Sequence, residues 1–145
     1  MYNHILIPTD GSPLSIVAME KSIDFARETG AKVTVITIVE PFHVFSSDAD
    51  QISKMRADHE RLGRERAADY LTVAELKAKA LGVPCETLQV ENDQPYQAII
   101  DAAVQRGCDL IAMASHGRRG LDAIILGSQT LKVLTHSKVP VLVYR

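Results

Sequence analysis

Residues 110–128 read Leu-Ile-Ala-Met-Ala-Ser-His-Gly-Arg-Arg-Gly-Leu-Asp-Ala-Ile-Ile-Leu-Gly-Ser, an apolar run followed by a glycine-rich loop. The run Leu110–Met113 predicts a buried strand, and Ser128 is a suitable start for a helix. Glycines let the backbone N–H groups of such a loop face an anion, and a helix N-terminus adds free donors and partial positive charge. The stretch therefore predicts a strand–loop–helix unit that suits a phosphate. The alternative is an ordinary strand-to-helix loop that is rich in glycine.

The same alternation of strand and helix extends along the rest of the chain. Runs of β-branched and apolar residues predict strands over 4–8, 32–39, 84–90, 108–113 and 138–144. Apolar residues at helical spacing predict helices over about 13–29, 52–80, 94–106 and 128–135. Capping residues support these limits: Ser12 and Asp93 precede two of the helices, and Gly30, Gly82 and Gly107 follow three of them.

This order predicts one domain over residues 1–145, an α/β fold of the Rossmann-like, doubly wound type. Its five-stranded parallel sheet would carry helices on both faces because the crossovers are right-handed. Ligands of such sheets bind beyond the carboxyl ends of the strands. Thr9-Asp10-Gly11-Ser12 follows the first strand, and the glycine loop follows the fourth. Since these two strands are neighbours in the common doubly wound arrangement, we expect a nucleotide site between the two loops.

Composition narrows the class of protein. The chain has 145 residues, 46% hydrophobic and 23% charged, with a net charge of −2. These values are ordinary for a soluble globule and give no support for nucleic-acid binding. No apolar run is long enough to span a membrane, and the N-terminus does not resemble a signal peptide. The two cysteines belong to no metal or disulfide pattern, so we expect free thiols in the cytoplasm.

Several chemistries remain open at Asp10, which could be a phosphoacceptor, a metal ligand, a hydrogen-bond acceptor for a base or ribose, or a turn residue. A phosphotransferase of the haloacid dehalogenase type would need an Asp where Pro8 stands. A receiver domain would need an Asp ending the third strand, which instead ends in Gln89-Val90-Glu91. Neither reading is therefore favoured.

Other catalytic and nucleotide motifs are weak or absent. The sequence has neither GxxxxGK[ST] nor GxGxxG, which disfavours a P-loop or the usual dinucleotide fold. Ser115-His116 could suggest a nucleophile and a base, but adjacent residues rarely face each other and no third orienting group is evident. The other histidines are scattered without metal-ligand spacing, so no protein metal site is expected.

The whole chain resembles the universal stress protein family. The resemblance rests on Pro8-Thr-Asp-Gly-Ser12, Ser115-His-Gly-Arg-Arg-Gly120, Leu126-Gly-Ser128 and Val139-Pro-Val-Leu-Val143. In the ATP-binding branch of that family the loop has the pattern G-x2-G-x9-G-[ST]. This sequence matches the pattern from Gly117 onward but has Ala114 at its first position. The resemblance implies a sheet in the order 3-2-1-4-5.

The resemblance also implies ATP as the ligand, with Mg²⁺ or Mn²⁺ bridging the phosphates. By this resemblance Asp10, beside Pro8 and Thr9, would accept hydrogen bonds from the nucleotide, and the Ile38 backbone would meet the adenine. The ribose and phosphates would be lined by Met113, His116, Gly117, Gly127, Ser128 and Gln129. Ala114 replaces a glycine of that lining, and this matters most if the backbone there needs positive φ. Arg118 and Arg119 could steady a triphosphate or could be ordinary solvated arginines.

We therefore expect a cytoplasmic stress-response protein that binds ATP as a regulator, with at most slow hydrolysis. The alternatives are a dimeric interaction module with a degenerate pocket and a genuine slow ATPase or phosphotransferase. A homodimer is expected through Val139, Val141 and Val143, because an uncharged apolar strand at a sheet edge invites pairing with another chain. The family resemblance implies the same dimer.

Overall fold

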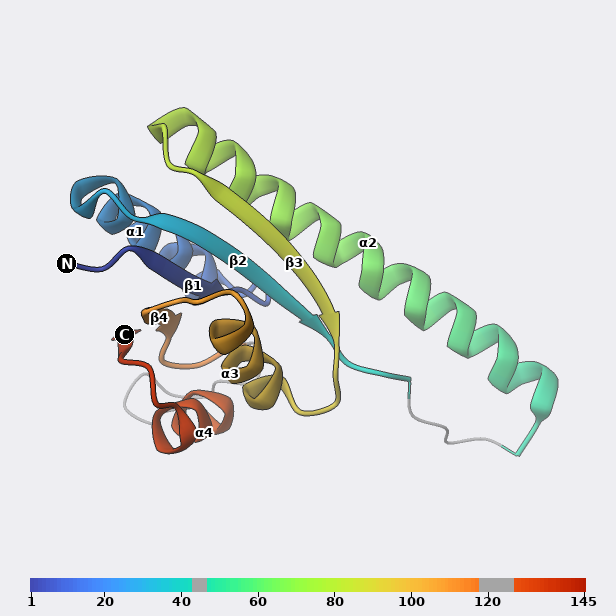
Figure 1. Ribbon diagram of the computed structural model, residues 1–145. Helices are drawn as coiled ribbons and strands as arrows, with labels where there is room; N and C mark the ends of the chain where they lie inside the picture. The colour runs from blue at the N-terminus through green and yellow to red at the C-terminus, as the bar shows by residue number, and fades with distance from the viewer. Residues whose placement is uncertain (43–46, 118–126) are drawn as a thin grey trace.

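The computed structural model describes residues 1–42, 47–117 and 127–145. Strands and helices alternate along the chain: β1 (His4–Pro8), α1 (Pro13–Thr29), β2 (Lys32–Val39), α2 (Ala49–Leu81), β3 (Cys85–Glu91), α3 (Pro95–Gln105), β4 (Leu110–Ala114), α4 (Ser128–His136) and β5 (Val141–Tyr144). The five strands pair in parallel in the order β3-β2-β1-β4-β5 (Figure 1). The predicted α/β fold and strand order are therefore confirmed.

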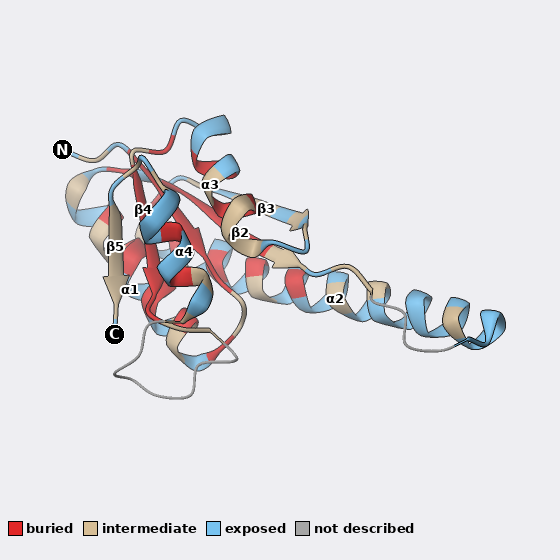
Figure 2. Cartoon of the chain, turned by 90° about the horizontal axis from the view of Figure 1, so that it is seen from below, coloured by how far each residue is buried: buried red, intermediate tan, exposed pale blue. Residues whose placement is uncertain are grey.

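Two hydrophobic cores lie on opposite faces of this sheet. One joins alternate residues of β1, such as Ile5 and Ile7, to α1 and α2. The other joins Leu6 to Ile99 of α3 and Val133 of α4. This division follows from the strand period of two, which sends successive side chains to opposite faces. Figure 2 shows the buried residues concentrated in β1, β2 and β4 and on the inward sides of the helices.

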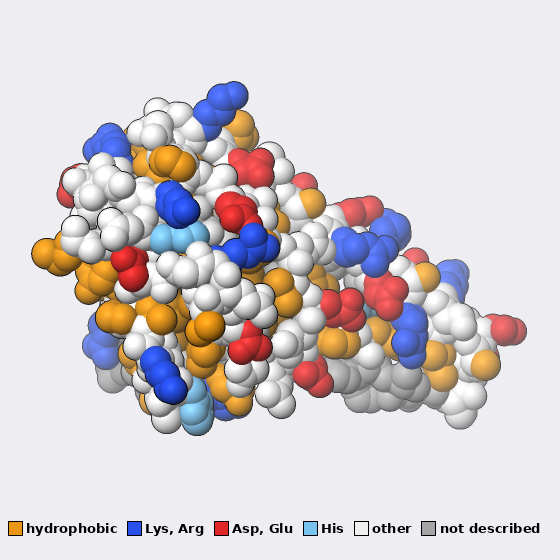
Figure 3. Space-filling view, in the orientation of Figure 1, with side chains coloured by type: hydrophobic (Ala, Val, Ile, Leu, Met, Phe, Trp, Pro, Cys, Tyr) orange, Lys and Arg blue, Asp and Glu red, His pale blue; other side chains and the backbone are white. Residues whose placement is uncertain are grey.

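The helix α2 is much longer than the sheet it covers. Its buried residues are Ala67, Leu71, Ala74 and Ala78, a stripe at helical spacing in the second half of the helix. The first half extends past the sheet and is largely exposed (Figures 1 and 2). On the face seen in Figure 3, basic and acidic side chains are interspersed along this arm and do not gather into one basic surface.

Two predicted helix starts were wrong. The helix expected from residue 52 begins at Ala49, because the Asp48 side chain accepts the N–H groups of Asp50 and Gln51 at 3.0 and 3.2 Å. The third helix is not capped by Asp93. Its N-cap is Gln94, which makes no side-chain capping bond. In contrast, Ser12 caps α1 as predicted, accepting the N–H of Ser15.

The fourth and fifth strands begin later than predicted. The N–H of Cys108 bonds to the carbonyl of Ala103 at 2.9 Å, so this residue takes part in the turn that follows α3. Before β5, the Ser137 hydroxyl accepts the N–H of Val139 at 3.0 Å and donates to its carbonyl at 2.8 Å. These local bonds occupy backbone groups that a longer strand would need.

The two cysteines are both free, as expected, and their surroundings make them poor nucleophiles. Burial is the main cause that raises the pKa of the Cys85 and Cys108 thiols to about 11. In the described part of the chain, no helix has the length and apolar character needed to cross a bilayer.

Candidate functional site

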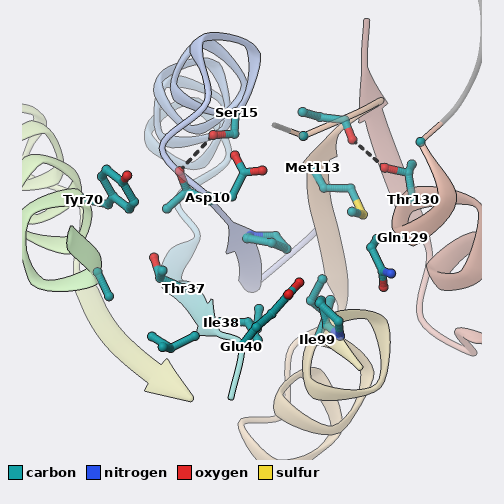
Figure 4. Close-up of a pocket in the computed structure, with 18 of the residues that line it drawn as sticks. Asp10, Ser15, Thr37, Ile38, Glu40, Tyr70, Ile99, Met113, Gln129 and Thr130 are labelled. Atoms are coloured by element: carbon teal, nitrogen blue, oxygen red, sulfur yellow. Dashed lines mark hydrogen bonds between the residues drawn. The ribbon is translucent and has the colours of Figure 1, made fainter. Parts of the chain in front are cut away.

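A cavity of about 440 Å³ opens at the carboxyl ends of β1, β2 and β4 (Figure 4). It is lined by every predicted site residue that the structure describes: Pro8, Thr9, Asp10, Ile38, Met113, Ala114, His116, Gly117, Gly127, Ser128 and Gln129. Arg118, together with Arg119 and Gly120, lies outside the described residues. The position matches the rule that ligands of open α/β sheets bind beyond the carboxyl ends of the strands.

The turn after β1 forms one wall of the cavity. Gly11 has φ +77°, and a Cβ there would collide with the ring of Tyr70 from α2. Asp10 accepts the N–H of Ser12 at 2.9 Å, and the hydroxyls of Thr9 and Ser15 lie 3.2 Å apart. This turn holds the Asp10 carboxylate at the carboxyl end of the sheet, beside the cavity.

The segment after β4 faces that turn, as the fold predicts. A Cβ added at Gly117 would overlap the Asp10 carboxylate, so the two loops are in direct contact. Gly127 also approaches closely: its N–H bonds to the Ser115 carbonyl at 2.7 Å, and a Cβ there would lie 3.1 Å from the His116 Cα. Close packing leaves little room for a side chain at either glycine.

The N-terminus of α4 forms the end of the cavity beside these glycines. Gly127 is its N-cap and has no side chain that could accept a hydrogen bond from the first turn. The helix is fixed to β4 by Thr130, whose hydroxyl donates to the Ala114 carbonyl at 2.9 Å. The helix dipole and the N–H groups of the first turn together favour an anion at this place.

Ala114 does not need the backbone conformation that would favour glycine. It is the last residue of β4 and is buried. Its φ is not positive, because among the described residues only glycines have positive φ. The expected difficulty with a methyl group at this position therefore does not arise from backbone strain.

The opposite end of the cavity is mainly apolar, with Glu40 beside Ile38 and Ile99 (Figure 4). Ile38 from β2, Pro95 and Ile99 from α3, and Met113 from β4 line it. Gln129 connects this end to α4, because its side-chain oxygen accepts the N–H of Tyr96 in the first turn of α3 at 2.9 Å. The cavity thus has one end rich in backbone donors and one end suited to a flat apolar group.

A third wall, supplied by α2, was missed in the sequence. His59, Gly63, Arg66, Ala67 and Tyr70 line the cavity from one side of that helix. Their spacing of three to four residues is a helical stripe, which could have been found by asking which face of α2 continues past the buried alanines. Whether this stripe faces the cavity depends on how α2 packs against the sheet, and the spacing of the residues does not determine that.

The cavity carries no nucleophile–base pair among the described residues. The Ser115 hydroxyl is buried without a hydrogen-bond partner in this part of the chain, so His116 does not activate it. The nearest contact of the His116 ring nitrogen Nδ1 is the carbonyl of Gly117 at 3.3 Å. In the same described residues, no cluster of three or more His, Cys, Asp or Glu could hold a metal ion. This geometry suits binding better than covalent catalysis.

Comparison with known proteins agrees with this fold. The family model described as "Universal stress protein family" matches residues 1–145. Universal stress protein MJ0531 of Methanocaldococcus jannaschii is 31% identical over 145 residues, covering 100% of this chain and 83% of the relative.

Two solved structures are similar over nearly the whole chain. MJ0577 of Methanocaldococcus jannaschii has a TM-score of 0.81 and 26% identity, covering 99% of this chain and 95% of its own. A universal stress protein in complex with cAMP has a TM-score of 0.71 and 27% identity, covering 99% and 97%. With the sheet order, the loop contact and the family match over its full length, this chain belongs to the universal stress protein family.

Proposed function

We propose that this protein binds ATP in the cavity at the carboxyl ends of β1 and β4. The observation that carries the proposal is the contact between Asp10 and Gly117 beside the N-terminus of α4, whose N-cap is the glycine Gly127. It sets a donor-rich end against an apolar end within one cavity of about 440 Å³. A nucleoside triphosphate has the same division, with an anionic end and a flat, weakly polar base.

Each part of the nucleotide then has its own surroundings. The phosphates lie against Gly117, Gly127 and the first N–H groups of α4. The adenine lies between Ile38, Ile99 and Met113. The sugar crosses the end of β1 beside Asp10. The relative that was solved with cAMP supports the choice of an adenine nucleotide, since it shares this fold at 27% identity.

Mg²⁺ or Mn²⁺ would be held mainly by the phosphate oxygens. The acidic side chains among the described lining residues are Asp10 and Glu40, too few for a protein-built metal site. When bound, the cation would neutralise phosphate charge. The chain itself supplies N–H donors and shape.

The role is that of a nucleotide-dependent regulator, with at most slow hydrolysis, because the described residues lack an activated nucleophile and a placed base. Its cytoplasmic location stays a prediction of the sequence. The second candidate is an interaction module of the same fold that binds no nucleotide. Only a measurement of binding separates these two functions.

The test is calorimetric titration of the folded protein with ATP and with GTP in the presence of Mg²⁺. We expect binding of ATP and weaker binding of GTP. The purified protein should also release adenine nucleotide on heating, detectable by chromatography. Absence of heat at millimolar ATP, with no nucleotide released, would contradict the proposal and favour the interaction module.

We further propose a homodimer through β5, which lies at the edge of the sheet. The carbonyls of Pro140 and Tyr144 bond to Ile111 and Ser115 at 2.9 and 2.7 Å, toward β4. Because backbone groups alternate along a strand, those of Val141 and Val143 are directed to the open edge. The Val139 backbone is already bonded to Ser137, so the proposed pairing narrows to Val141 and Val143.

Val143→Pro tests this interface, because it removes an outward N–H and leaves the bonds to β4 in place. We expect a wild-type mass of two chains by light scattering at tens of micromolar, and one chain for the variant. Circular dichroism should show the fold retained. A monomeric wild type would refute the dimer, and a dimeric variant would locate the interface elsewhere.

A further inference from the structure

One polar atom of the cavity wall lacks a partner. Among the described residues, two buried side-chain polar atoms make no hydrogen bond: Thr37 Oγ1 and Ser115 Oγ. Thr37 is 4% exposed and lines the cavity, whereas Ser115 is 1% exposed and is not part of the lining. A buried hydroxyl without a partner is uncommon and destabilises the fold unless something satisfies it.

The position of Thr37 on β2 fixes the side of the sheet that it faces. Val35 packs in the core with α1 and α2, and Ile36 packs in the core with α3 and α4. With side chains alternating along the strand, Thr37 faces α1 and α2, and Ile38 faces α3. Figure 4 shows Thr37 between Tyr70 and Ile38 at the end of β2.

The two sides of the cavity therefore differ in polarity. The α3 side contributes the apolar side chains of Ile38, Pro95, Ile99 and Met113, with Glu40 and Gln129 beside them. The α1 and α2 side carries the hydroxyls of Thr9, Ser15, Thr37 and Tyr70. Thr9 and Ser15 already bond to each other at 3.2 Å, which leaves Thr37 as the hydroxyl that needs a ligand.

We propose that Thr37 Oγ1 hydrogen-bonds a hydroxyl of the ribose and makes the site selective for ribonucleotides over deoxynucleotides. This inference rests on the proposed function. The sugar joins the base, on the apolar side, to the phosphates at α4, so it crosses the end of β1. We place its hydroxyl edge on the α1 and α2 side, where the Thr37 hydroxyl has no partner among the described residues. A site built to pair with a hydroxyl rejects the analogue that lacks it.

The same geometry predicts opposite effects on stability and binding. Thr37→Val keeps the shape of the side chain and removes a hydroxyl that has no partner in the nucleotide-free protein. We therefore expect the variant without nucleotide to melt at the same or a higher temperature than the wild type. A purely structural role for the hydroxyl predicts a lower melting temperature.

The binding experiment compares ATP, 2′-deoxyATP and 3′-deoxyATP on the wild type and on Thr37→Val. For ATP we expect a loss of affinity of about three- to tenfold in the variant, the size of one hydrogen bond. One of the two deoxy analogues lacks the contacted hydroxyl. It should bind the wild type more weakly than ATP does, and the variant should bind it as well as the wild type.

Ser115→Ala is the matched control, since it removes the other unpartnered buried hydroxyl, which does not line the cavity. It should leave the affinities for all three nucleotides unchanged. If Thr37→Val weakens all three nucleotides equally, or does not affect ATP, the inference is wrong while the proposed function stands. If the wild type binds none of the three, the proposed function fails and this inference fails with it.

Discussion

The two ends of the parallel sheet carry similar polar residues but satisfy them differently. Each end has a histidine and an aspartate next to a strand: His4 and Asp109 at the amino end, His116 and Asp10 at the carboxyl end. At the amino end these groups bond to the protein itself. At the carboxyl end they surround a cavity.

At the amino end, Asp109 accepts the N–H groups of Asn3 and His4 at 2.9 and 3.0 Å. The His4 ring lies 2.6 Å from the Thr34 hydroxyl, fully inside the fold. These bonds connect β1 to β2 and to the start of β4. The polar groups here serve the folded state, and no cavity is needed to explain them.

At the carboxyl end, by contrast, the Thr37 hydroxyl has no partner among the described residues, and the N-cap of α4 is a glycine, which has no capping side chain. Within the described part of the chain, both buried hydroxyls without a partner lie at this end of the sheet. The difference teaches that a buried polar residue indicates a binding site when it lines a cavity and its bonds are incomplete, and a folding role when they are complete.

The largest effect should come from Gly127→Val. A Cβ here would lie 3.1 Å from His116 Cα and 3.3 Å from the Ser115 carbonyl oxygen, so the side chain would push α4 away from β4. The phosphate end of the site would be lost, and ATP binding should become undetectable by calorimetry. The variant should still show a folded circular dichroism spectrum.

Gly107→Ala is the control at the amino end. This glycine has φ +68° and open space around it, so alanine strains the backbone without a clash. Stability should fall by about 1 kcal/mol while ATP affinity stays unchanged. If the wild type and Gly127→Val bind ATP with equal affinity, then Gly127 is not part of the binding site.

Substitutions of Asp10 and Asp109 should have effects of intermediate size, the first on ATP affinity and the second on the stability of the fold. Asp10→Ala should weaken ATP binding by about 1–3 kcal/mol, if the carboxylate accepts a buried hydrogen bond from the nucleotide. Asp109→Ala should lower the melting temperature and leave the affinity unchanged, because backbone N–H groups lose their acceptor far from the cavity. The reverse pattern in calorimetry and thermal melts would overturn the comparison.

A smaller effect is expected in the pH dependence of stability, through His4 at the amino end of the sheet. Burial, aided by the Lys32 charge, lowers the pKa of His4 below its ordinary value of 6.5. The unfolded chain therefore takes up this proton first, and the free energy of unfolding should decrease as the pH falls below 6.5. Denaturant midpoints at pH 7.5 and 5.5 measure this, and His4→Gln should reduce the decrease.

Asp109 does not contribute to the pH dependence of stability in that range. Burial acts to raise its pKa, but the backbone N–H groups of His4 and Asn3 outweigh this and hold the pKa below 3.8. Its contribution to stability is fully present above the unfolded value and is lost only as the pH falls through the folded pKa. An unchanged pH dependence in His4→Gln would show that another group is responsible.

The smallest effect is expected for Ala114→Gly, which restores the glycine of the family loop. Ala114 ends β4 without positive φ, so its methyl imposes no backbone strain. Affinity for ATP should change by no more than about twofold, measured beside the wild type in the same titration. A large loss would mean that this loop works differently from the one in the ATP-binding branch.

Most elements and the position of the cavity could be predicted, because they depend on local pattern. Ser12 before Pro13 indicated the start of α1, and the β-branched run 32–39 indicated β2. Limits set by distant or competing contacts could not be predicted. The first turn of α3 is bonded by Gln129, a residue 33 positions away from Tyr96, and β5 is shortened by the side chain of Ser137.

By itself, the sequence determined the α/β fold, the contact between the loops after β1 and β4, and the glycines at that contact. These follow from apolar periodicity and from residue types that tolerate close approach, which are local properties. Only the tertiary structure decided which side of α2 lines the cavity and which buried hydroxyl there lacks a partner. Both depend on how distant segments pack, since a hydrogen bond is satisfied or unsatisfied only when all surrounding groups are in place.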